Sequence, residues 1–73
     1  MNLGQLPPGA DGVVTGLEAA PAHRLRLAEL GFRLGQNVRV THRAAFGGRV
    51  VAIGADRFAL DRATCARVQV DRG

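Results

Sequence analysis

Few side chains in this sequence could perform covalent chemistry. The chain has no serine, lysine, tyrosine or tryptophan, which leaves three threonines and Cys65 as possible nucleophiles. A reactive thiolate needs a partly exposed, electropositive setting, which Arg62 and the start of a short helix could supply. Because free cysteine is more often a small buried hydrophobic residue, we interpret Cys65 as a core residue and expect no catalytic site.

The histidines give little support for a metal site. His23 and His42 are the only imidazoles, and the sequence has no Cys-x-x-Cys, His-x-x-x-His or Glu-x-x-His spacing. Zinc and iron sites usually bring several such ligands together. We therefore predict no bound metal and no cofactor.

The segment Phe46 to Arg49 lacks the lysine and the spacing of a phosphate-binding loop. Two interpretations of it remain open. The two glycines can simply permit positive φ in a hairpin loop. Alternatively, Phe46 flanked by Arg43 and Arg49 is an exposed tip that binds another protein, since aromatic and arginine side chains dominate binding hot spots.

All ten basic residues are arginines, against six acids, so the net charge is +4. Each guanidinium is a planar fork suited to carboxylates and phosphates. The arginines are interspersed with acids, and three phenylalanines are few for a nucleic-acid surface. We rank solvated faces first, an acidic partner surface second and nucleic acid third.

A helix followed by a sharp turn organises the middle of the chain. Leu27 and Leu30 share one helix face, and Gly31 follows where a left-handed C-terminal residue is expected. Phe32 can then fold back on the helix. Leu25 points away from the apolar face and is a further candidate contact. The glycines assigned to structural turns are Gly31, Gly35, Gly47 and Gly48.

The remaining pattern predicts short strands joined by turns. Pro21 suits the first turn of a helix over residues 22–30, and Asp61 can cap a helical turn that reaches Ala66. A β-bulge at Gly16 would turn both Val14 and Leu17 inward. The expected strands span residues 13–18, 37–43, 49–53, 57–60 and 67–71.

These elements predict one domain over residues 1–73, a mainly β, small closed barrel. Such a short chain buries only about 60% of its unfolded surface, so its stability margin is thin. We see no secretory signal and no apolar run long enough to span a membrane. The expected core comprises Val14, Leu17, Leu27, Leu30, Val38, Val40, Ile53, Phe58, Leu60, Val68 and Val70, with Cys65 beside it.

Four motifs, in order and at matching spacing, resemble the FeoA family over nearly the whole chain. The most specific is Arg-Leu-x-x-Leu-Gly-Phe-x-x-Gly from Arg26 to Gly35. The others are Leu-Pro-Pro-Gly at Leu6 to Gly9, Phe-Gly-Gly at Phe46 to Gly48, and Ala-Leu-Asp-Arg-x-x-Cys-Ala-Arg-Val from Ala59 to Val68.

The resemblance implies an SH3-like barrel with a short helix inserted after the first long strand and a helical turn before the last. It also implies a non-enzymatic accessory role beside a FeoB-type membrane transporter of ferrous iron. The chain would then be cytoplasmic, held at the inner membrane only through its partner and not itself membrane-spanning. The candidate docking residues are Leu25, Arg43, Phe46 and Arg49.

Other interpretations compete with this one. They are a small barrel that binds nucleic acid, a metal-linked regulatory SH3-like domain, and an enzyme or thiol sensor that uses Cys65. The sequence pattern favours the FeoA-like role and no nucleic-acid partner. It leaves open the oligomeric state, the docking face and the sign of any effect on the transporter.

Overall fold

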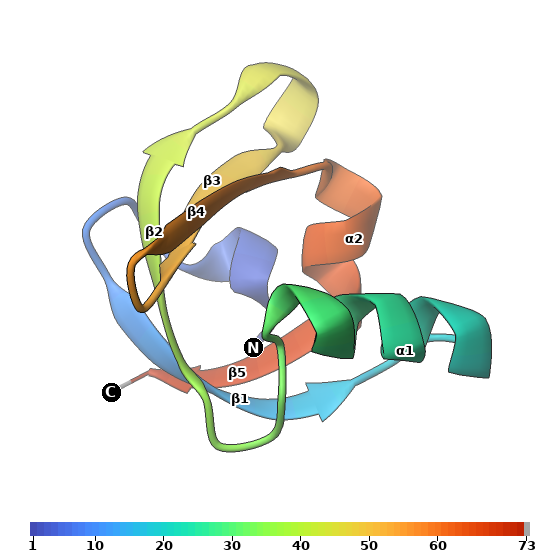
Figure 1. The fold of residues 1–73 in the computed structure, drawn as a ribbon. Coiled ribbons are helices and arrows are strands. Elements are labelled where there is room, and N and C mark those ends of the chain that lie inside the picture. Colours follow the sequence, from blue (N-terminus) through green and yellow to red (C-terminus); the bar gives the residue numbers. More distant parts are fainter. Residues whose placement is uncertain (73) are drawn as a thin grey trace.

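The structure, a computed structural model, describes residues 1–72 (Figure 1). Five strands form one antiparallel sheet in the order β4-β3-β2-β1-β5. The strands are β1 (Asp11–Leu17), β2 (Asn37–Arg43), β3 (Arg49–Ile53), β4 (Asp56–Leu60) and β5 (Val68–Arg72). The expected mainly β fold is therefore confirmed, with every strand boundary within two residues of the prediction.

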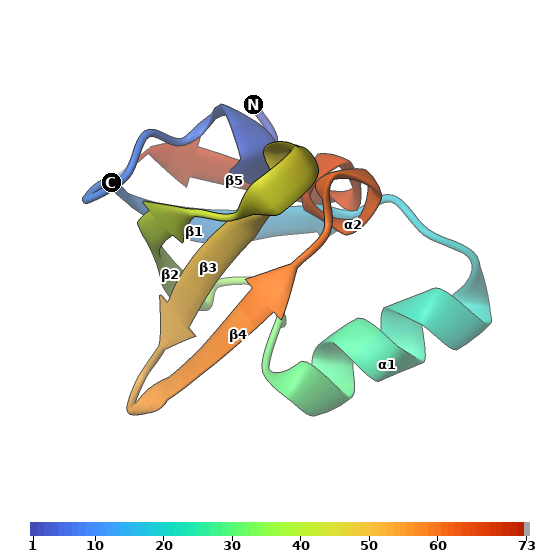
Figure 2. The same ribbon diagram turned by 90° about the horizontal axis from the view of Figure 1, so that it is seen from above.

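Two α-helices connect strands of the sheet, α1 between two neighbouring strands and α2 between the two edge strands. Helix α1 (Pro21–Leu30) joins β1 to β2, and α2 (Arg62–Arg67) joins β4 to β5. Short 3-10 turns, η1 (Leu3–Gln5) and η2 (Ala45–Gly47), precede β1 and β3. The sheet curls strongly, and α1 stands to one side of it (Figure 2). Within residues 1–72 the hydrogen-bonded ladder stops at β4 and β5, which α2 connects, so hydrogen bonds do not close the expected barrel.

The end of α1 has the predicted geometry. Gly31 has φ 108°, in the left-handed region. The N–H of Gly31 donates to the carbonyl oxygen of Ala28 at 3.0 Å, and the N–H of Phe32 donates to that of Leu27 at 2.9 Å. This pair of bonds is a Schellman motif, which satisfies carbonyls left open at a helix end. It also turns the Phe32 ring into the core, where its exposure is 0%.

Glycines shape the first strand and the loop that follows α1. Gly35 has φ 85°, as predicted, and its N–H donates to the Val14 carbonyl oxygen at 2.8 Å. The pairing of β1 with β5 shifts register between Val14 and Gly16, which confirms the predicted bulge. Val14 is buried, whereas Leu17 is only half-buried, because the bulge lies near the end of the strand.

The core matches the prediction in part. Seven of the expected apolar residues and Cys65 are buried, whereas Leu17, Leu30, Ile53 and Phe58 are half-buried at its margin. The prediction missed Leu3, Leu6, Phe32 and Val51. Val51 is buried because it pairs with Val40 in the middle of the sheet. The N-terminal residues are buried because an Asn2–Gln69 bridge and a bond from Val70 N–H to Met1 O tie this segment to β5.

Candidate functional site

Phe46, at the centre of η2, is the most exposed large apolar side chain, with 99% of its surface accessible. Its backbone has φ 55° and ψ 36°, the only positive φ outside glycine among residues 1–72. A bulky residue in this region is a conformational outlier. Strain of this kind concentrates at functional sites. We therefore keep this loop as a candidate contact surface.

Arg49 holds this loop in shape from within the chain. Its Nη1 donates to the carbonyl oxygens of Gly47 at 3.0 Å and Gly48 at 2.9 Å. Its Nη2 donates to the carbonyl oxygen of Gly4 at 2.9 Å, which links η1 to the loop. The Arg49 fork is therefore engaged with backbone oxygens, whereas Arg43, at the end of β2, is exposed.

The two loop glycines are required for different reasons. Gly47 has φ 79°, as predicted. Gly48 has φ −72°, so the expectation of positive φ there is wrong. A Cβ at Gly48 would lie 2.7 Å from the carbonyl oxygen of Leu60. Glycine is required at this position because the backbone of Leu60 lies too close for a side chain, and not because of a special dihedral angle.

Leu25 is also exposed, at 63%, as predicted from its place on the helix. It lies on α1, whereas Phe46 lies on η2, and both views show these elements well apart (Figures 1 and 2). The two candidate anchors therefore do not form one continuous patch.

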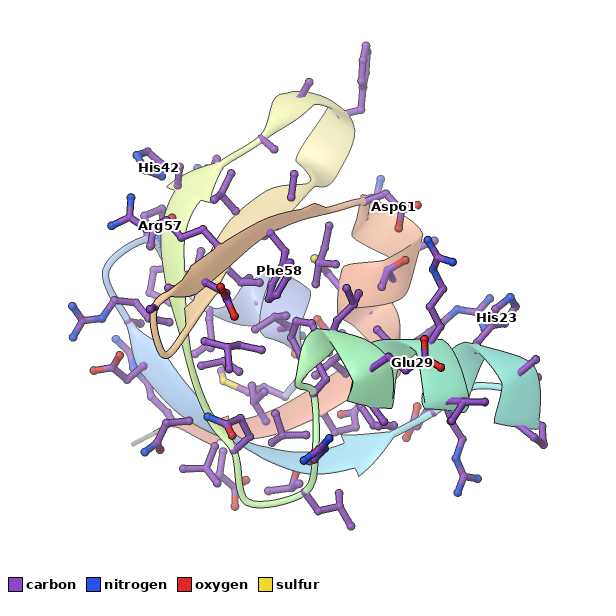
Figure 3. The ribbon with its side chains drawn as sticks, viewed as in Figure 1. His23, Glu29, His42, Arg57, Phe58 and Asp61 are labelled. Carbon is purple, nitrogen blue, oxygen red and sulfur yellow. The ribbon has the colours of Figure 1, made fainter. Side chains whose placement is uncertain are left out.

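A cavity of ≈ 400 Å³ separates α1 from α2 and the end of β4. Leu27, Leu30 and Leu60 contribute apolar lining, and Arg26 and Arg67 contribute positive charge. His23 on α1 and Asp61 at the start of α2 also line it (Figure 3). We refer to this cavity as the interhelical groove. Sequence reasoning missed it, because no local pattern indicates that α1 and α2 lie side by side.

Asp61 has a structural role at the edge of this groove. Its Oδ1 accepts a hydrogen bond from the N–H of Thr64 at 2.7 Å, which is the predicted N-cap of α2. Hydrogen bonding to Thr64 holds the pKa of this carboxyl below its ordinary value. The carboxylate therefore caps the N-terminus of α2.

Cys65 is fully buried on α2, as interpreted from the sequence. Its Sγ lies 3.9 Å from the carbonyl oxygen of Leu60, to which the thiol donates. Burial raises the pKa of the thiol. A protonated, inaccessible thiol is a poor nucleophile, which disfavours the enzyme and thiol-sensor interpretations.

The possible metal ligands do not converge. Among residues 1–72, no three His, Cys, Asp or Glu side chains are grouped so that they could hold a metal ion. His23 and His42 lie on opposite sides of the molecule (Figure 3). The Nδ1 atom of His42 instead lies 2.9 Å from Thr41 Oγ1. None of the helices formed by the described residues is long and apolar enough to cross a membrane.

Comparison with known proteins defines the class of this domain. A structure of Stenotrophomonas maltophilia FeoA with zinc, described as a procaryotic SH3-domain protein, superposes with a TM-score of 0.83 at 38% identity, over 97% of this chain and 89% of that one. An iron uptake regulatory protein (FeoA) superposes with a TM-score of 0.88 at 25% identity, over 99% of this chain and 95% of that one. The fold is thus that of an SH3-like domain.

The family model of the FeoA domain matches residues 1–72, and the chain belongs to the FeoA family. This is a family of small accessory proteins linked to ferrous iron transport and is not an enzyme family. A manganese-dependent transcriptional repressor also superposes, with a TM-score of 0.87 at 24% identity over 99% of this chain but 41% of that one, which shows a shared fold alone. A search of functionally curated proteins finds no match.

Proposed function

We propose that this chain is a non-enzymatic accessory module of ferrous iron uptake that docks on the cytosolic part of a FeoB-type membrane transporter. Membership of the FeoA family supports the process. The S. maltophilia relative is described as a candidate activating factor of bacterial ferrous iron transport. In this role the chain works in the cytoplasm and reaches the membrane only through its partner.

The observation that carries the docking proposal is the Phe46 side chain. It is fully exposed on a loop whose backbone is held in a left-handed conformation. Ordering a flexible loop on binding costs free energy, and a loop backbone that is already held in one conformation avoids part of that cost. Arg43 supplies an exposed charge near this anchor for carboxylates of the partner, and Arg49 positions the loop from behind.

Helix α1 provides a second, separate contact surface. Leu25 is exposed on it, and the interhelical groove offers an apolar floor with Arg26 and Arg67 at its edge. A transporter much larger than this domain can touch both surfaces at once. Variants in each surface therefore have to be tested separately.

The test is binding of the purified chain to the detergent-solubilised FeoB-type transporter of the same cell. Phe46→Ala, Arg43→Glu and Leu25→Ala should leave the fold intact because all three side chains are exposed. We expect at least one of them to weaken binding about tenfold or more, which corresponds to about 1.4 kcal/mol. Arg57→Glu, an equally exposed charge on β4, serves as the matched control and should bind like the parent.

Two outcomes would contradict the proposal at different levels. If all three variants bind like the parent, the proposed surfaces are wrong although the partner stands. If the parent chain does not bind and deletion of its gene leaves ferrous iron uptake unchanged, the partner assignment fails.

A further inference from the structure

A second cavity, of ≈ 460 Å³, lies between η1, the η2 loop and α2, away from the interhelical groove. Its lining contains two arginines and no carboxylate. The lining residues are Asn2, Gly4, Gln5, Gly47, Arg49, Arg62 and Ala66. We call it the arginine cavity.

The Arg49 side chain in this cavity is charged and half-buried but has only neutral partners. Its terminal nitrogens donate to three backbone carbonyl oxygens. Its Nε is buried and has no hydrogen-bond partner. Among residues 1–72 it is the one buried side-chain nitrogen or oxygen without a partner. A buried donor without a partner is costly, and in a native structure it calls for an explanation such as local strain, an ion or a water molecule.

Arg62 places a second guanidinium on the wall of the same cavity. A Cβ built on Gly47 would lie 3.0 Å from Arg62 Cδ, so the stem of Arg62 lies across this glycine. No ion pair to Arg62 or Arg49 occurs in residues 1–72, where the one salt bridge joins Arg39 to Asp11. Two cations at one cavity without a counter-charge raise the local positive potential.

We propose that the arginine cavity binds an oxyanion, contacted by Arg49 and Arg62. Arginine forks match the oxygen geometry of phosphate and carboxylate groups. A bound oxyanion would offset the charge of the two arginines and could accept hydrogen bonds from Arg62 and from the Arg49 Nη2 hydrogen that is not used on Gly4. Asn2 and Gln5 line the cavity with amide groups that can donate further bonds.

The curled loop beside the cavity holds the Arg49 guanidinium in place. Phe46 and Gly47, both with positive φ, curl the loop so that the carbonyl oxygens of Gly47 and Gly48 reach Arg49 Nη1. These bonds fix the guanidinium before any ligand arrives. Because the guanidinium is already held in place, binding through its remaining Nη2 hydrogen loses little conformational entropy.

The test is a titration of the isotope-labelled chain followed by amide chemical shifts in NMR spectra. Sodium phosphate is added at pH 7, with sodium chloride at matched ionic strength as the reference. We expect saturable shifts confined to the amides of Gly4, Gly47, Arg49 and Arg62. A parallel titration with sodium acetate tells whether a carboxylate can replace phosphate. Saturable local shifts with either ion support an oxyanion site and identify its source.

Variants separate a specific site from general attraction to a basic protein. Arg62→Gln removes one fork from an exposed position and should weaken binding about tenfold, as expected for loss of a charge-assisted contact. Arg62→Lys keeps the charge without the fork and should weaken it less. Arg57→Gln removes the same charge from β4, outside the cavity, and should leave the affinity unchanged.

The proposal is overturned if phosphate and acetate shift amides no differently from chloride. It is equally overturned if Arg62→Gln, with a folded spectrum, binds as tightly as the parent, or if Arg57→Gln weakens binding to the same degree. None of these outcomes depends on the transporter, so the oxyanion site and the docking proposal stand or fall separately.

Discussion

Gly48 illustrates how one residue can be required by space and not by its dihedral angles. Its φ of −72° is open to any amino acid. The obstacle is the Leu60 carbonyl oxygen, 2.7 Å from where a Cβ would lie. Since that neighbour is backbone, it cannot turn aside as a flexible side chain would. Such a requirement is invisible in the sequence, where Gly48 resembles any other loop glycine.

Gly48→Ala should therefore destabilise the fold, by about 1–3 kcal/mol as for other overpacked sites. Gly16→Ala is the matched control, because its Cβ would meet Gln69 Cβ at an ordinary 3.6 Å. Urea unfolding followed by circular dichroism measures both variants. Equal stability of the two would contradict the close approach of β4 to the η2 loop.

Asp61 gives the chain a pH-dependent contribution to stability. Its pKa in the folded state is lowered by hydrogen bonding to Thr64, so the folded state binds fewer protons than the unfolded one near that pKa. The contribution is present above the unfolded pKa of about 3.9 and is lost as the pH falls through the lower folded value.

Asp61→Ala should accordingly lower the thermal unfolding midpoint at neutral pH, because α2 loses its N-cap. The difference from the parent should shrink below about pH 4 as the carboxylate is protonated. Scanning calorimetry across this range measures it. A difference that stayed constant down to the acid limit would mean that the charge on Asp61 contributes nothing.

At the scale of elements, α1 is attached to the domain through few contacts. Leu27 is the one buried residue of this helix, and Leu30 is half-buried beside it. The Schellman motif at Gly31 and the buried ring of Phe32 anchor its C-terminal end. The N-terminal half carries exposed residues and borders the interhelical groove, which leaves that half accessible to a partner.

Leu27→Ala should cost about 2–5 kcal/mol of unfolding free energy, the range for truncating a buried leucine. Leu25→Ala, two positions earlier and exposed, should change it by about 0.5 kcal/mol or less. Chemical denaturation of both variants compares the two faces of one helix. A reversal of this order would mean that α1 presents its other face to the core.

At the scale of the whole molecule, one small core holds segments from both ends of the chain. Leu3 and Leu6 from the N-terminus share it with Val68 and Val70 from β5. The Phe32 ring lies in the same core, with its centroid 6.3 Å from that of Phe58. A domain this small has little stability to spare, so loss of one large core side chain affects every element.

Phe32→Ala should cost about 3–5 kcal/mol, a large share of the ~5–15 kcal/mol that keeps a domain folded. We expect substantial unfolding at 37 °C, seen as loss of amide dispersion in NMR spectra. Phe46→Ala removes the same side chain from an exposed site and should retain the native spectrum. Native spectra for both variants would refute the assignment of Phe32 to the core.

The sequence by itself determined the helices and strands and the glycine turns between them. Alternating apolar residues located β2, an apolar run between two glycine turns located β3, and the Leu30-Gly31-Phe32 run located the end of α1. These features depend on residues close in sequence, where backbone preference and periodicity act directly. The motif spacing identified the FeoA family for a related reason, since each motif is local and the order is fixed along the chain.

Only the tertiary structure decided what those elements enclose. The interhelical groove needs α1 beside α2, and the arginine cavity needs η1, the η2 loop and α2 together. Sequence alone assigned Arg49 to a docking tip, whereas its fork reaches the carbonyl oxygen of Gly4. These placements arise from contacts between distant segments, which pack to fill one core, and local periodicity carries no information about such contacts.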